Sequence, residues 1–139
     1  GLAESWSVSP DGLAITFKLR KHVRWHDGVD FTSEDVKFSV QRAMGKRSTT
    51  GYAGPLRTLV QDIETPAPDR VVIVTKEPTL IIPTYLSRVL STEGMILPKK
   101  YIESVGEDKA ALHPIGTGPF RHVEGKQGDY HRFEAVAGP

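Results

Sequence analysis

The sequence predicts an α+β fold in which antiparallel β-hairpins or a small sheet pack against two or three helices. Three observations predict it: strict apolar–polar alternation at residues 13–20, a capped amphipathic segment at 31–45, and pairs of short β-prone runs joined by turn residues. With 139 residues, of which 38% are hydrophobic and 25% charged, the chain is long enough to bury a core and polar enough to dissolve.

The first predicted hairpin turns at Ser9-Pro10-Asp11-Gly12, where proline and glycine stand at positions that a type I turn accepts. Its second strand alternates apolar and polar side chains, as a strand with one buried face does. The apolar positions are Leu13, Ile15, Phe17 and Leu19. Val23 and Trp25 continue this period, so the strand is expected to run on to the Asp27-Gly28 turn, with His26 on its polar face.

A helix is expected directly after Thr32, which can cap the amides of the first turn. Acidic side chains at 34–35 place negative charge at the positive end of the helix. Phe31 and Val36 have the spacing of a hydrophobic staple, and the helical period ends at Gly45.

The middle of the chain predicts a loop and a second hairpin. Residues 45–55 are rich in glycine, hydroxyl and basic side chains, which is typical of an exposed loop. The turn residues at 65–69 separate two strands, and the β-branched run at 71–74 predicts that the second of them is buried.

Two helical segments and a third hairpin follow. Residues 79–90 predict a largely buried helix that starts or breaks near Pro83, with a strand as the alternative for 80–82. A further helix is expected from Pro98 to Gly106, followed by a short helical turn. The last hairpin is expected to turn at 125–128.

Composition excludes several classes of protein. A formal net charge of +1, with acidic and basic side chains interspersed, argues against a nucleic-acid binder. The absence of cysteine excludes thiolate zinc sites, catalytic thiols and disulfides. The chain has no apolar run of the ~18 residues that a membrane span needs and no signal-peptide pattern at its start, so it is expected to be either cytoplasmic or a piece of a longer protein.

Two motifs contain residue types that are found in catalytic or phosphate-binding sites, but their spacing does not favour either function. His26 and Asp27 form the best acid–base candidate, but adjacent strand residues point to opposite faces, so a plain turn is favoured. The Gly116-Thr117-Gly118-Pro119 turn lacks the further glycine and the following helix of a phosphate loop. No cofactor is expected.

The last hairpin contains the only constellation that suggests a metal. If Glu124 pairs with Asp129, the same register places His122 opposite His131, with Cβ atoms ~5 Å apart. Two imidazoles could then share a divalent cation, although a one-residue shift in register would separate them. The favoured alternative is an exposed polar face without metal.

Five motifs in order resemble the extracellular solute-binding proteins of family 5, the peptide- and nickel-binding components of ABC importers. They are the Ser-Trp hairpin, the "FKLRK" strand, the "HDG" turn, the "FTSEDV" helix start and, much later, "GTGPF". Together they span nearly the whole chain. The departures are small, since that family often has glycine where His22 stands and proline or threonine in place of Val29 and Asp30.

The resemblance implies that the chain is an internal fragment of a larger two-lobed protein. Residues 1–112 would form roughly the peripheral domain of a periplasmic-binding-protein-like (class II) fold, and residues 113–139 the strands returning to the first lobe. The implied function is ligand capture for an ABC importer of peptides or a similar small solute, without catalysis. The alternatives are an isolated structural or interaction domain and, less favoured, a hydrolase using His26 and Asp27.

The resemblance also implies where the ligand and the partners bind. The segment "STEGM" and the Gly-Thr-Gly turn are expected to run near the cleft. The expected ligand-binding residues are Arg88, Ser91, Thr92, Glu93 and Thr117. An ordinary solvated loop with Arg88 on an exposed helix face is the alternative. A membrane permease is the expected partner, and the periplasmic or extracellular space, with the protein lipid-anchored or soluble, is the expected location.

Overall fold

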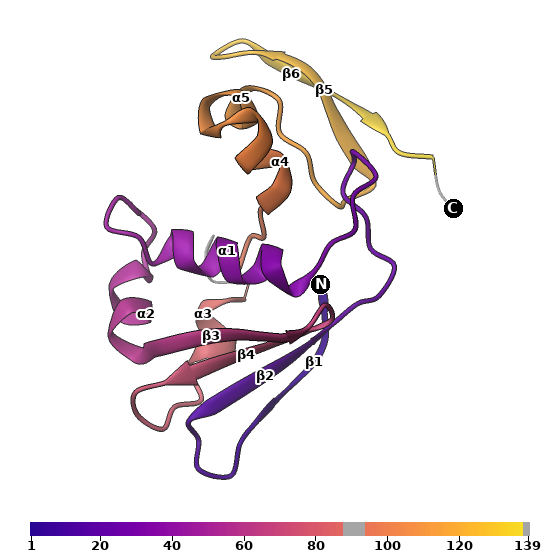
Figure 1. The fold of residues 1–139 in the computed structure, drawn as a ribbon. Coiled ribbons are helices and arrows are strands. Elements are labelled where there is room, and N and C mark those ends of the chain that lie inside the picture. Colours follow the sequence, from indigo (N-terminus) through magenta and orange to yellow (C-terminus); the bar gives the residue numbers. More distant parts are fainter. Residues whose placement is uncertain (88–93, 138–139) are drawn as a thin grey trace. The chain divides into compact units, whose positions relative to one another are not determined.

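The computed structural model describes residues 1–87 and 94–137 (Figure 1). The chain divides into two compact units. Unit 1 comprises Gly1–Lys21 and Thr32–Leu97, and unit 2 comprises His22–Phe31 and Pro98–Pro139. The mixed composition of helices and antiparallel strands confirms the α+β prediction.

Unit 1 is built on a four-stranded antiparallel sheet with the order β1-β2-β4-β3. The strands are β1 (Ala3–Val8), β2 (Ala14–Leu19), β3 (Val60–Ala67) and β4 (Arg70–Thr75). Both predicted hairpins of this unit are therefore confirmed, although residues 65–67, expected in the second turn, belong to β3 and the turn is formed by Pro68 and Asp69. In the centre of the sheet β2 pairs with β4, and Ile15 lies opposite Ile73. Both side chains are fully buried, because the alternating positions of the two strands share one face.

The turn between β1 and β2 is held by local hydrogen bonds. Gly12, whose φ is +72°, donates its amide to the Ser9 carbonyl at 2.9 Å. The Asp11 carboxylate accepts from the Ser9 hydroxyl and from the Leu13 amide. These two bonds favour the ionised form and lower the pKa of Asp11 below its ordinary value.

Helix α1 (Ser33–Ala43) lies across one face of this sheet (Figure 1). It begins where the sequence predicts, directly after Thr32, and the Asp35 carboxylate accepts a 2.9 Å hydrogen bond from the Thr32 amide. Ser33 fixes the same end, because its hydroxyl donates to the carbonyl of Ala67, the last residue of β3, and its amide to the carbonyl of Pro68 in the turn that follows. Val40 is fully buried and belongs to the core beneath the helix.

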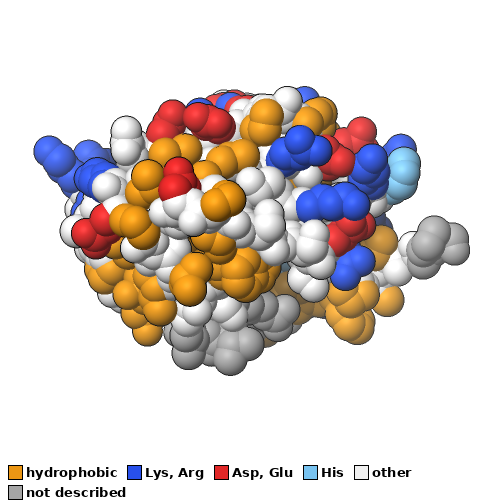
Figure 2. All heavy atoms as spheres, turned by 90° about the horizontal axis from the view of Figure 1, so that it is seen from below, with side chains coloured by type: hydrophobic (Ala, Val, Ile, Leu, Met, Phe, Trp, Pro, Cys, Tyr) orange, Lys and Arg blue, Asp and Glu red, His pale blue; other side chains and the backbone are white. Residues whose placement is uncertain are grey.

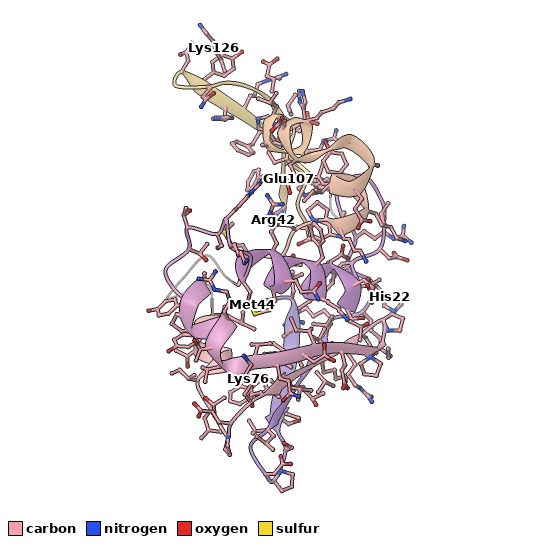
Figure 3. All side chains as sticks on the ribbon, turned by 60° about the vertical axis from the view of Figure 1, so that its left-hand side comes forward. His22, Arg42, Met44, Lys76, Glu107 and Lys126 are labelled. Atoms are coloured by element: carbon pink, nitrogen blue, oxygen red, sulfur yellow. The ribbon has the colours of Figure 1, made fainter. Side chains whose placement is uncertain are left out.

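The opposite end of α1 is capped from a helix that the sequence did not predict. Helix α2 (Ala53–Leu59) begins within the segment expected to be a loop, and Arg57 on it donates to the Met44 carbonyl at 3.2 Å and the Gly45 carbonyl at 3.0 Å. A cation on the last carbonyls of a helix stabilises them. Figure 3 labels Met44 at this end and Lys76, which donates to the Arg57 carbonyl at 3.2 Å.

The helix expected at 79–90 is short. Helix α3 (Ile82–Tyr85) is a single turn with Pro83 in its first positions, and Ile82 is fully buried. The strand alternative for 80–82 is wrong, and residues 88–90 lie outside the described residues.

Unit 2 contains the helices α4 (Lys99–Val105) and α5 (Glu107–Leu112) and the hairpin of β5 (Phe120–Lys126) and β6 (Tyr130–Ala135). The two helices confirm the prediction, since Gly106, with φ +85°, separates them. The hairpin is confirmed, but Gly125 lies within β5 and the turn comes one to two residues later than expected. No helix among the described residues is long and apolar enough to cross a membrane.

The predicted continuation of β2 through Val23 and Trp25 is wrong. His22 adopts a φ of +61°, in the left-handed region, and this breaks the strand. The segment after it forms no strand and makes one isolated bridge, between Arg24 and Asp30.

Candidate functional site

The Trp25-His26-Asp27-Gly28 segment folds into a closed loop between the paired residues Arg24 and Asp30. The Trp25 amide donates to the Val29 carbonyl, and the Gly28 amide donates back to the Trp25 carbonyl, both at 2.8 Å. Asp27 accepts from the Val29 amide at 3.0 Å, and Gly28 takes a φ of +86°. These are the local bonds that an Asp-Gly turn makes, so the sequence itself folds this loop.

Aromatic side chains hold the base of the loop. Trp25 is 4% exposed and Phe31 is 7% exposed, and their rings meet edge to face with centroids 6.2 Å apart. This arrangement is favoured by the ring quadrupoles and fixes the loop from which His26 projects.

His26 joins this loop to the Gly116-Thr117-Gly118 turn, about 90 residues further along the chain. Its backbone amide donates to the Gly116 carbonyl at 2.9 Å, and the Gly116 amide donates to His26 Nδ1 at 3.1 Å. The other ring nitrogen, Nε2, lies 2.8 Å from the Gly118 carbonyl oxygen. We call this set of three hydrogen bonds the His26 clasp.

Only one form of the imidazole satisfies the clasp. Nδ1 must accept because an amide donates to it, and Nε2 must carry the hydrogen because it faces a carbonyl oxygen. The tautomer that carries its hydrogen on Nε2 is the one that satisfies these contacts, and both nitrogens then bind backbone groups.

This geometry corrects the expectation that His26 stands on an open polar face. The side chain is half-buried, and its lone pair and its hydrogen are both committed to the backbone. Asp27 binds a different group, the Val29 amide. The two side chains therefore act as two separate structural anchors, and an acid–base pair is not assembled here.

Thr117 lies between the two glycines that His26 holds, and it is the only expected ligand-binding residue within the described part of the chain. It is half-buried. The clasp fixes the backbone on both sides of Thr117, which is the condition for a loop residue to present its side chain in one place. The other four, Arg88, Ser91, Thr92 and Glu93, lie outside the described residues.

The two histidines of the last hairpin meet, although not in the expected register. His131 lies opposite Gly125 and His122 opposite Phe133, because the ladder shifts between His122 and Glu124. His122 Nε2 and His131 Nδ1 are nevertheless 3.2 Å apart. Among the residues that the structure describes, no group of three or more histidine, aspartate or glutamate side chains is placed to hold a metal ion.

The link between His26 and the Gly-Thr-Gly turn is the feature of this candidate site that the sequence did not predict. Each of the two motifs by itself predicts only a local turn. Their joint presence in one chain was the available signal, since a histidine with an acceptor and a donor can bind two backbone groups of one tight turn.

Comparison with known proteins places the chain in a family. The sequence profile of bacterial extracellular solute-binding proteins, family 5 Middle, matches residues 1–138. A putative ABC transporter peptide-binding protein of Brucella ovis is 39% identical over 126 residues, in a match that covers 86% of this chain and 23% of that protein. The dipeptide-binding protein of Escherichia coli is 30% identical and matches 99% of this chain and 29% of its own length.

A solved structure of a solute-binding protein also matches the chain over nearly its whole length. The solute-binding protein MoaA from A. tumefaciens R10, in complex with mannopinic acid, superposes with a TM-score of 0.85 at 33% identity, covering 97% of this chain and 27% of that one. The chain thus spans between a fifth and a third of the length of the proteins that it matches.

Proposed function

The chain belongs to the bacterial extracellular solute-binding proteins of family 5, and from this premise we propose that the protein of which it forms part captures a small solute for an ABC importer. The observation that carries the proposal is the match to the family over residues 1–138. The His26 clasp supports it, because it joins two of the motifs on which the resemblance rests into one structural unit.

We propose a peptide or a similar small solute as the ligand. The relatives are named for peptides and dipeptides, and the matching solved protein holds mannopinic acid. The ligand would be released unchanged, because His26 and Asp27 are engaged with the backbone and offer no acid–base pair.

The proposed contacts are Thr117 and the segment containing Arg88, Ser91, Thr92 and Glu93. The support for Thr117 is its place in a turn whose backbone is fixed on both sides. Arg88 would pair with a carboxylate of the ligand, since a guanidinium binds that group with two parallel hydrogen bonds.

Exposed apolar side chains support the proposal that further chain packs on this segment. Phe120 is 62% exposed and Phe133 57% exposed, on a hairpin of only two strands, which is marginal alone. Figure 2 shows a face on which hydrophobic side chains also gather, and Leu80 and Met95 are exposed in unit 1. We propose that residues 113–139 return to the first lobe and that residues 1–112 form the peripheral domain.

The partner and the location follow from the same premise. We propose that the full-length protein delivers its ligand to a membrane permease of the ABC type. Because the family is extracellular, we propose a periplasmic or extracellular protein, either lipid-anchored or soluble.

The test is a ligand screen on the full-length protein, followed by calorimetry. Di- and tripeptides and mannopinic acid are added separately while the melting temperature is recorded, and a ligand at a hundred times its Kd adds about 2.7 kcal/mol to the free energy of unfolding. Mass spectrometry of the released ligand then asks whether it is intact. Cleavage would contradict the proposal, as would the failure of every peptide and of mannopinic acid to raise the melting temperature.

Variants locate the site. Thr117→Val keeps the size of the side chain and removes the hydroxyl, so it should weaken binding at least several-fold if that hydroxyl contacts the ligand. Thr49→Val is the matched control, because Thr49 is exposed and lies in the loop before α2. If the two variants bind the ligand with equal affinity, the hydroxyl of Thr117 does not contact the ligand.

A further inference from the structure

We propose that the β5–β6 hairpin binds a divalent transition-metal ion between His122 Nε2 and His131 Nδ1. The inference is independent of the proposed ligand capture and rests on the geometry of this one hairpin. It names a class of ion, Zn²⁺ or Ni²⁺, for which imidazole is a suitable ligand.

The separation of the two nitrogens fits a shared ion. They lie 3.2 Å apart, and two imidazole nitrogens at 2.0–2.1 Å from a tetrahedral ion are about 3.3 Å apart. In the absence of metal, one ring donates its hydrogen to the other. Both rings can accept a metal as neutral tautomers, once His122 carries its hydrogen on Nδ1 and His131 carries it on Nε2.

Gly125 makes this approach of the rings sterically accessible. It lies opposite His131 in the ladder, and the rings occupy the space beside its α-carbon. A Cβ at this position would overlap His131 Nδ1 and would stand 3.0 Å from His122 Nε2. In this arrangement the two rings occupy space that is free because residue 125 has no side chain.

The surroundings orient the rings and do not oppose a cation. The rings of His122 and Phe133 meet edge to face, with centroids 5.5 Å apart and planes at 74°. The charged side chains between 120 and 135 form ion pairs with each other: Arg121–Glu134, Glu124–Arg132 and Lys126–Asp129. Lys126, labelled in Figure 3, lies at the turn end of the hairpin. Each positive charge of this hairpin is thus balanced by a carboxylate, which limits its repulsion of a metal ion.

Two protein ligands leave coordination positions for water or for a group from a bound molecule. No third histidine, aspartate or glutamate joins the pair among the described residues. We therefore expect a site that chelates through two imidazoles, with each histidine strengthening the hold of the other because the second bond is intramolecular.

The experiment is calorimetric titration of untagged full-length protein with ZnCl₂ and, separately, NiCl₂. We expect a site in the parent that weakens at least about tenfold in His122→Gln and in His131→Gln. His113→Gln is the matched control, because His113 is an exposed histidine outside the hairpin, and it should bind as the parent does. Equal metal binding by the parent and by the His122→Gln/His131→Gln double variant would overturn the proposal.

Gly125→Ala tests whether the arrangement of the two histidines matters as well as their presence, since it keeps both imidazoles and pushes them apart. We expect several-fold weaker binding, and affinity equal to that of the parent would overturn the chelate. A second measurement needs no variant: Ni²⁺ should broaden the imidazole NMR signals of His122 and His131 before that of His113. If Ni²⁺ broadens other signals and leaves those of His122 and His131 unchanged, the proposed site is refuted.

Discussion

Replacement of His26 tests the clasp most directly. Alanine removes both side-chain bonds to the distant turn, the one from the Gly116 amide and the one to the Gly118 carbonyl. Asparagine and glutamine remove one bond each. The asparagine oxygen can stand near the place of Nδ1 and accept from the Gly116 amide, and the glutamine nitrogen can stand near the place of Nε2 and donate to the Gly118 carbonyl.

The expected magnitude follows from the two bonds. A hydrogen bond contributes about 1 kcal/mol net, so His26→Ala should lower the free energy of unfolding by about 2 kcal/mol. His26→Asn and His26→Gln should each cost about half as much. The half-buried position allows water to reach the released amide, which keeps the cost below that of a fully buried unsatisfied group.

Two assays report the effect. Urea unfolding, followed by the fluorescence of the buried Trp25 beside His26, gives the free energy. Hydrogen exchange of the Gly116 amide reports the local bond, and it should quicken in the alanine and glutamine variants and remain slow in the asparagine variant. His113→Ala is the control and should change the free energy of unfolding by less than about 0.5 kcal/mol.

Two results would refute the reasoning. One is an alanine variant that unfolds like the parent and protects the Gly116 amide equally well. The other is a nitrogen NMR spectrum showing the His26 hydrogen on Nδ1, because that tautomer cannot accept from the Gly116 amide.

Three further predictions concern the scaffold. Ser9→Ala should raise the pKa of Asp11 toward its ordinary value, because the hydrogen bond from the Ser9 hydroxyl is the largest cause of its lowering. The lowered pKa stabilises the folded state above the unfolded pKa of Asp11, and this stabilisation is lost as the pH falls through the folded pKa. A carbon NMR titration in which the pKa of Asp11 is the same in the variant and the parent would contradict this. His22→Gly should raise the free energy of unfolding by about 0.5–1 kcal/mol, because glycine adopts a φ of +61° without strain, and thermal unfolding in which His22→Ala gains as much would refute the explanation. Ile73→Ala should cost about 2–5 kcal/mol, since this side chain is fully buried in the central pair of strands, and a urea midpoint close to that of the parent would show that the core is misplaced.

Local patterns in the sequence predicted most of the elements. The period-two alternation of β2, the turn at Ser9–Gly12 and the start of α1 after Thr32 all depend on neighbours within a few residues, and the structure confirms them. Helix α2 was missed because its residues 53–55 read Ala-Gly-Pro, a poor helical start that tertiary contacts of Leu56 and Arg57 override.

The sequence by itself thus determined the α+β class, the order of hairpins and helices, and the resemblance that the family match confirms. Tertiary structure alone decided the environment of His26, because its partners lie about 90 residues away and no local period encodes them. Tertiary structure also brought the rings of His122 and His131 together. The register of the hairpin differs from the expected one, and Gly125 leaves room for both rings. The physical reason is the same in each case: hydrogen bonds and steric room between distant segments depend on how the chain packs, whereas turns, caps and alternation depend on adjacent residues.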